Sequence, residues 1–235
     1  MAHHFIRAIC RKLMLAGWVL ALVSCATPSP EPQVPVTGLA WPSPPAPAQI
    51  VYVRAISSPA DLGLKKNFFA RVFEFVFGEE QQRLIRPMAV VDVAGVIYVA
   101  DPGAKGVHRF DRPAGKYRLL HEKGDSGLPS PVGMAVGPNG DVFVTDSVLA
   151  AVFVLKPGAE FATRLTLNGT LKQPTGVAFD SVNQQLYVSD TYAHDIKVFT
   201  LDGALINTMG RRGDGDGEFN FPTMLWRSDS GQLLV

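Results

Sequence analysis

Apolar and polar residues beyond position 82 follow a pattern that returns about every 44 residues. Each unit opens with a proline and a short apolar stretch, passes through a turn rich in glycine, asparagine and aspartate, and continues into a β-branched and aromatic run. Short runs bounded by turn residues predict antiparallel β-strands. We expect first strands at 88–91, 132–136 and 175–179, and second strands at 96–101, 142–146 and 186–190.

Two further strands complete each unit. Apolar residues six and nine positions beyond the aspartate that ends the second strand predict a third strand, and a fourth is clearest at 204–209. The period is kept by two independent columns, the prolines Pro87, Pro131, Pro174 and Pro222 and the acids Asp101, Asp146 and Asp190. Four short strands in a unit of this length predict one blade of a β-propeller. The expected fold class is therefore all-β, with about three and a half four-stranded blades over residues 82–235.

The units resemble NHL repeats, the blade type of six-bladed β-propellers, over about residues 83–235. The resemblance rests on the Pro-X-Gly-Val-Ala-like start at 131–135 and 174–178, on the Tyr/Phe-Val-X-Asp end of the second strand, and on the glycine-rich stretch 210–219. Met88-Ala89 and Thr223-Met224 depart from the pattern where a glycine is expected.

The resemblance also bears on the length of the chain. A ring of six blades with this period would need about 264 residues, whereas the fourth unit here stops before its acid. An incomplete ring leaves an apolar blade face and open strand edges bare. We therefore expect a truncated or frameshifted piece of a longer protein that is poorly soluble by itself.

The acids Asp101, Asp146 and Asp190 stand at the same strand end in every unit. A catalytic or metal site needs different residue types that converge once, whereas an identical residue in each repeat indicates an identical structural task. An aspartate at a strand end accepts hydrogen bonds from loop amides and stabilises the turn. We interpret the three residues as structural blade acids rather than as a metal ring.

The N-terminus has the pattern of a secretory signal peptide over residues 1–24. A basic head precedes an apolar run at 13–23, which is too short to span a membrane and ends on small residues. A buried core helix is the alternative. The sequence Leu-Val-Ser-Cys at 22–25 resembles the lipobox of bacterial lipoproteins, which implies that Cys25 carries a lipid and becomes the mature N-terminus. Ala26 in the next position implies the outer membrane of the cell envelope.

Residues 25–81 connect this anchor to the repeats. Eight of the 18 prolines lie at 26–48 and predict an extended tether of up to roughly 70 Å, with a ligand for an SH3-like partner as the alternative. Residues 50–56 predict a strand, which in similar propellers closes the ring. Residues 64–77 predict an amphipathic helix with a narrow polar stripe. We expect this helix to pack on the propeller; contact with a membrane surface is the alternative.

Charge and composition narrow the function classes. The 22 basic and 21 acidic residues are balanced, which argues against a nucleic-acid partner. The two cysteines, Cys10 and Cys25, cannot form a disulfide scaffold. The histidines that remain after signal cleavage, His108, His121 and His194, occupy positions that differ between the repeats. Common catalytic motifs are absent from the sequence, and we expect no catalytic residue, metal ligand or cofactor, a calcium site at 214–218 being the less favoured alternative.

These observations favour a lipid-anchored envelope protein whose propeller binds a protein, peptide or glycan partner through its loops. The resemblance leaves an enzyme open as the alternative, because relatives by fold include metal-dependent lactonases and lyases with a site at the central channel. Fold alone does not decide between the two.

Overall fold

The computed structural model describes residues 39–42, 45–64, 83–124, 127–228 and 230–235. It divides into two units, Met1–Arg54 and Ala55–Val235. The predicted signal peptide, Cys25 and most of the proline-rich tether lie outside the described residues, and so does the predicted helix apart from Leu64. Within the described ranges, no helix has the length and apolar character needed to cross a membrane.

The first unit contains one small antiparallel sheet, in which β1 (Ala40–Trp41) pairs with β2 (Ile50–Val51). The expected strand at 50–56 is therefore too long, and its partner lies in the stretch predicted as an extended tether. Ile50, Val51 and Val53 are 65%, 58% and 84% exposed. β2 ends at Val51, and beyond it the amide of Tyr52 donates one more backbone hydrogen bond, to the carbonyl of Leu39 at 2.8 Å.

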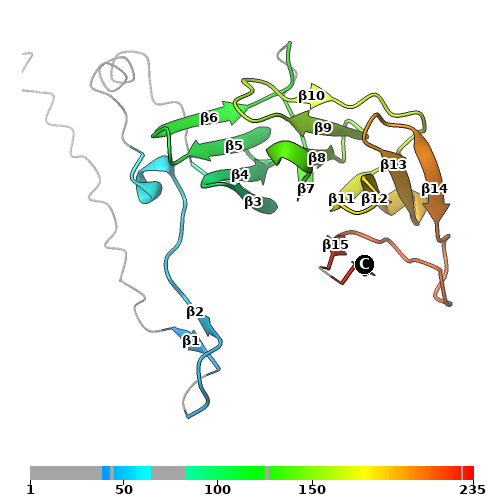
Figure 1. The fold of residues 1–235 in the computed structure, drawn as a ribbon, viewed down its shortest axis with the longest axis horizontal. Helices are drawn as coiled ribbons and strands as arrows, with labels where there is room; N and C mark the ends of the chain where they lie inside the picture. The colour runs from blue at the N-terminus through cyan, green and yellow to red at the C-terminus, as the bar shows by residue number, and fades with distance from the viewer. Residues whose placement is uncertain (1–38, 43–44, 65–82, 125–126, 229) are drawn as a thin grey trace, which may run out of the picture. The chain divides into compact units, whose positions relative to one another are not determined.

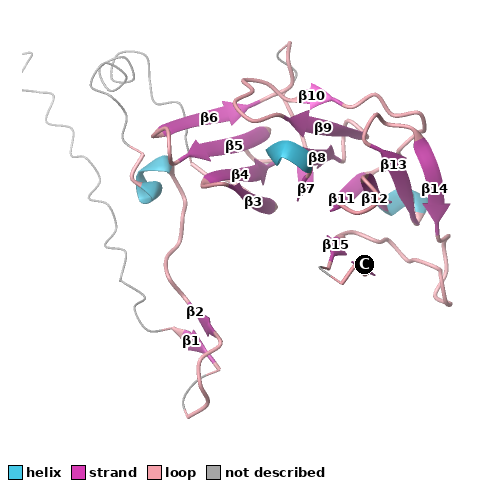
Figure 2. Cartoon of the chain, viewed as in Figure 1, coloured by secondary structure: helices cyan, strands magenta, loops and turns pink. Residues whose placement is uncertain are grey.

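The second unit consists of sheets whose strands pair in chain order (Figures 1 and 2). Blade 1 is formed by β3 (Ala89–Val93), β4 (Val96–Asp101), β5 (Gly106–Asp111) and β6 (Lys116–Leu120). Blade 2 is formed by β7 (Pro131–Val136), β8 (Val142–Asp146), β9 (Ala151–Leu155) and β10 (Thr163–Arg164). Blade 3 is formed by β11 (Pro174–Asp180), β12 (Gln185–Asp190), β13 (Asp195–Thr200) and β14 (Leu205–Met209).

A smaller sheet follows blade 3, in which β15 (Trp226–Arg227) pairs with β16 (Leu233–Leu234). We call it the fourth sheet. Three short 3-10 helices, η1 (Pro59–Leu62), η2 (Pro138–Gly140) and η3 (Thr191–Ala193), complete the regular structure of the described residues. The predicted all-β class and the predicted four-stranded units are confirmed.

Apolar cores lie between successive blades. Tyr98 and Val107 of blade 1 pack with Val144 and Phe153 of blade 2, and all four are buried. A second cluster joins blades 2 and 3, and a third joins blade 3 to the fourth sheet. On the other side of blade 1, Leu62, Leu64 and Leu84 pack with Val99 and Phe110. The segment around η1 therefore covers the outer face of the first blade.

Candidate functional site

The first strands of the blades, β3, β7 and β11, lie on the inner side of the row of sheets, where β7 contacts both of its neighbours (Figure 1). They border a groove with a volume of about 390 Å³, which extends to the fourth sheet. This volume lies within the range of small-ligand pockets. The side chains that shape the groove are apolar: Met88, Val90, Met134, Val177, Met224 and Trp226.

Several of these apolar side chains are open to solvent. Met88 is 49% exposed, Val90 66%, Met224 56% and Trp226 69%. Clusters of exposed apolar residues mark binding surfaces, and methionine adapts its shape to different partners. The sequence prediction left the binding residues open, because nothing in the local pattern of β3 or β15 distinguishes a groove-facing apolar residue from a core one.

Glycines form the floor of the groove where two blades meet. A Cβ atom at Gly133 would lie 2.2 Å from the carbonyl oxygen of Thr175, and one at Gly176 would lie 2.3 Å from that of Thr223. Real Cβ contacts are never that short, so each position requires glycine. The glycine of the Pro-X-Gly-Val-Ala-like start is thus explained by the backbone of the next repeat, which passes directly over it.

A side-chain hydroxyl joins the same backbones. The Oγ1 of Thr145 accepts a hydrogen bond from the amide of Gly133 at 2.9 Å and donates one to the carbonyl of Thr175 at 2.6 Å. The Oγ of Ser189 does the same between Gly176, at 2.7 Å, and the carbonyl of the following repeat, at 2.6 Å. We call this arrangement the hydroxyl bridge.

The hydroxyl bridge sits one residue before the blade acid, and sequence reasoning missed it. Thr145 and Ser189 both stand directly before the blade acid, so the sequence does repeat a hydroxyl residue at this position. The carbonyl that each hydroxyl bonds lies in the next repeat, which the local sequence does not indicate. Blade 1 differs, because it has Ala100 at the hydroxyl position and Ala89 at the glycine position. The junction between blades 1 and 2 therefore lacks the bridge and is held by its apolar cluster.

The three blade acids are fully buried. Asp101 accepts hydrogen bonds from the amides of Ile85, Arg86 and Ala104 at 2.6, 2.9 and 3.1 Å. Burial acts to raise the pKa of Asp101, but these amide bonds outweigh it and the net pKa lies below the ordinary value. The acid thereby ties the segment that leads into β3 to the loop that follows β4.

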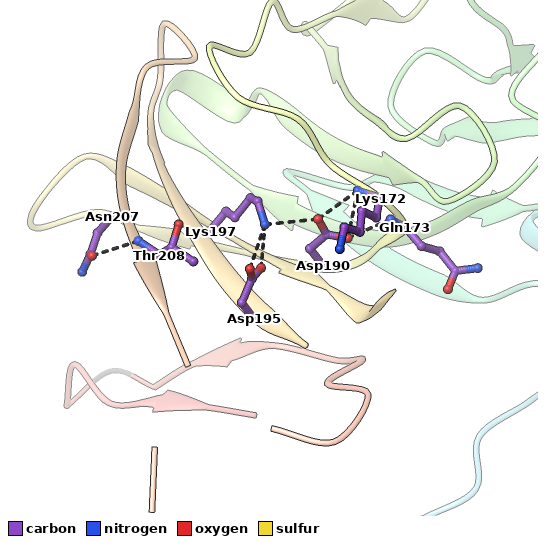
Figure 3. A network of polar contacts seen from close by, with 7 residues as sticks. All are labelled: Lys172, Gln173, Asp190, Asp195, Lys197, Asn207 and Thr208. Carbon is purple, nitrogen blue, oxygen red and sulfur yellow. Dashed lines mark hydrogen bonds and ion pairs between the residues drawn. The ribbon is translucent and has the colours of Figure 1, made fainter. Parts of the chain in front are cut away.

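The other two acids make equivalent contacts. Asp146 accepts hydrogen bonds from the amide of Ser130 and from two loop amides that follow β8. Asp190 accepts them from the amides of Lys172 and Gln173, and Lys197 on β13 lies 3.2 Å from it (Figure 3). These backbone contacts are those of a structural role, and each acid positions the start of a groove-lining strand.

The three histidines of the described residues have different surroundings. His108 is buried within blade 1, the Nδ1 of His121 lies 3.1 Å from the carbonyl of Lys105, and the Nδ1 of His194 accepts a hydrogen bond from the amide of Phe221. Glu218, which lies in the acidic stretch of the alternative calcium site, forms an ion pair with Arg211 at 2.9 Å. Among the described residues, no three histidine, cysteine, aspartate or glutamate side chains are grouped as metal ligands.

The repeat pattern identifies the blade type. A model of the NHL repeat matches residues 171–199, which span β11, β12 and most of β13. Residues 171–199 of blade 3 therefore match an NHL repeat, and blades 1 and 2 have the same order of four antiparallel strands. The gluconolactonase of Xanthomonas campestris superposes with a TM-score of 0.50 and 24% identity, over 63% of this chain and 54% of that one, which supports the propeller fold.

Curated proteins that are similar to the chain in sequence include two peptidyl-glycine alpha-amidating monooxygenases. Peptidyl-glycine alpha-amidating monooxygenase B of Xenopus laevis is 30% identical over 186 residues, which is 72% of this chain and 19% of that protein. The peptidyl-glycine alpha-amidating monooxygenase of Mus musculus is 28% identical over 124 residues, 47% of this chain and 13% of that protein. The chain thus spans less than a fifth of the length of these relatives.

Proposed function

We propose that the NHL-repeat blades serve as a binding scaffold and that the groove along β3, β7 and β11 receives a peptide segment with apolar side chains. The observation that carries the proposal is the groove itself. It is lined by apolar side chains from three blades and from the fourth sheet, and its outer members are half exposed or more.

The chemistry of the lining favours a peptide among the partner classes that the sequence left open. A glycan presents hydroxyl groups that need hydrogen-bonding side chains, and nucleic acid needs clustered positive charge. Leucine, methionine or aromatic side chains of a peptide match Met88, Met134 and Trp226. The similar monooxygenases are named for peptidyl-glycine, which agrees with an occupant of this kind.

The lipid anchor belongs to the same proposal. Cys25 at the end of a signal-like segment would attach the chain to the outer membrane, and the proline-rich tether would present the blades at a distance from it. A single lipid chain gives only marginal membrane binding, whereas the diacylated cysteine of a lipoprotein anchors stably.

A second candidate function is catalysis in the same groove, which the 30% identity to the Xenopus laevis enzyme favours. Propeller enzymes of the lactonase and lyase type rely on a metal ion. The described residues that line the groove supply neither carboxylate nor imidazole, so they do not fit such an ion. Metal analysis of the purified protein separates the two candidates, because a tightly held stoichiometric ion would support the enzyme.

The binding proposal is tested with a random peptide library displayed on phage and selected on the full chain. A synthetic peptide from the selection is then titrated by calorimetry against two matched variants. Val90→Glu places a charge in the groove, and Val182→Glu places it in the turn between β11 and β12, where the valine is 82% exposed. We expect the first variant to lose binding at least tenfold and the second to retain it. Equal binding by both variants, or no selected peptide, contradicts the proposal.

A further inference from the structure

One position in the blades carries three different side chains. Seven residues after the blade acid stand His108 in blade 1, Phe153 in blade 2 and Lys197 in blade 3, each on the third strand. The Nζ of Lys197 lies 3.2 Å from Oδ2 of Asp190, and the Nε2 of His108 lies 3.4 Å from Oδ2 of Asp101. The acid therefore has a lysine beside it in blade 3 and an imidazole in blade 1, whereas blade 2 has an apolar side chain at the equivalent position.

His108 is fully buried, as is Asp101. Its Nδ1 lies 2.8 Å from the hydroxyl oxygen of Tyr117, and its ring stacks on Phe110 with the centroids 5.9 Å apart. Apart from the long approach to Asp101, Nε2 has no hydrogen-bond partner among the described residues. The imidazole is thus enclosed between a carboxylate and a phenol.

The surroundings of His108 make its protonation costly. The titratable groups that face it are Asp101 from β4, Tyr117 from β6 and His121 directly after β6. A buried imidazolium loses its hydration, and the carboxylate that could compensate already accepts three backbone amides. A protonated Nε2 that moved closer to Oδ2 of Asp101 would share that oxygen with the amide of Ile85, which it accepts at 2.6 Å, and would compete with this hydrogen bond.

We infer that Asp101, His108 and Tyr117 form an acid-sensitive latch inside blade 1, next to the segment that leads into the groove. Charging of His108 loosens the hold of Asp101 on residues 85 and 86, which lead directly into Pro87 and Met88 of the groove. The link to regulated binding rests on the proposed function, whereas the latch itself is a property of blade 1. Blade 2, with Phe153, and blade 3, with Lys197, have no imidazole at this position.

The burial of His108 sets the direction in which pH changes the stability of the folded blade. Burial lowers the pKa of His108 and outweighs the attraction of Asp101, which raises it. As the pH falls below about 6.5, the unfolded chain takes up this proton before the folded one does. Acid therefore destabilises the folded blade, and this one group changes the ratio of folded to unfolded chain by up to about tenfold between pH 7.5 and 5.5.

The test is hydrogen exchange of the full chain at pH 7.5 and 5.5, corrected for the intrinsic exchange rate and followed by mass spectrometry. We expect protection of residues 83–89 to fall by up to about tenfold at pH 5.5 in the native chain. His108→Phe, which copies blade 2, should remove this fall, and His121→Asn should leave it in place. A fall that persists in His108→Phe, or its absence in the native chain, overturns the inference.

An NMR titration of the histidine ring protons gives a second readout that does not depend on the folding of the Phe variant. The signals of His121 and His194 are identified by their disappearance in His121→Asn and His194→Asn. We expect His108 to titrate below 6.5, and titration at or above that value contradicts the latch. Neither readout needs a bound peptide. A groove that binds no peptide at pH 7.5 would therefore contradict the proposed function and leave the latch standing.

Discussion

Removal of one hydroxyl group should weaken the junction between blade 3 and the fourth sheet. Ser189 is fully buried, and its Oγ joins the buried amide of Gly176 to the carbonyl of Thr223. Ser189→Ala leaves the amide without a partner, which costs about 1–3 kcal/mol. The loss of the hydrogen bond to the carbonyl of Thr223 costs less free energy, because this oxygen also accepts a hydrogen bond from the hydroxyl of Thr175. We therefore expect a loss of about 2 kcal/mol in the free energy of unfolding.

The assay is urea unfolding at pH 7.5, followed by circular dichroism. With a denaturant slope of about 2 kcal/mol per molar, this loss shifts the midpoint by about 1 M. The matched control is Ser189→Thr, because blade 2 makes the same bridge with Thr145. A loss below about 0.5 kcal/mol in the alanine variant, or an equal loss in the threonine variant, would refute the hydroxyl bridge.

Three further predictions concern the backbone, an ion pair and the anchor. Gly176→Ala should destabilise the chain by more than about 3 kcal/mol in the same urea assay, because its Cβ meets the carbonyl of Thr223 at 2.3 Å, and a near-native midpoint would contradict the close approach. Burial acts to raise the pKa of Asp180, but the hydrogen bonds from Asn183 and Arg227 outweigh it and lower this pKa to about 2. The stability that the ionised acid adds is therefore present above about pH 4 and is lost as the pH falls towards 2. In Asp180→Asn, the free energy of unfolding that is lost between about pH 4 and 2, measured by thermal unfolding, should be smaller by about 1–2 kcal/mol. An unchanged dependence of stability on pH would count against the ion pair of Asp180 with Arg227. Cys25→Ser should block incorporation of labelled fatty acid and release the chain from membranes, and continued labelling would disprove the anchor.

The repeated elements of the fold could be predicted because they depend on local sequence. Turn residues and the aspartate column delimit the second strands, and the predicted ranges 96–101 and 142–146 coincide with β4 and β8. The short β2 could not be predicted in the same way. An apolar run at 50–56 is typical of a strand, but whether it extends depends on a partner and a core that the run itself does not specify.

The site was harder to predict, because its contacts join different repeats. The carbonyl bonded by Thr145 lies 30 residues further along the chain, and the one bonded by Ser189 lies 34 residues further. The motif glycine was visible in the sequence, but its reason, the backbone of the next blade, was not. The exposure of Val90 and Trp226 likewise depends on how the sheets are arranged around the groove.

Photo-crosslinking of a selected peptide tests most directly whether the groove is the binding surface. The photoreactive residue p-benzoylphenylalanine replaces Val90 in one version of the full chain and Val182 in another. We predict that the peptide becomes linked to position 90 and that an excess of unlabelled peptide prevents the reaction. Equal linkage at both positions, or linkage at position 182 alone, would show that the peptide binds elsewhere and would contradict the proposed function.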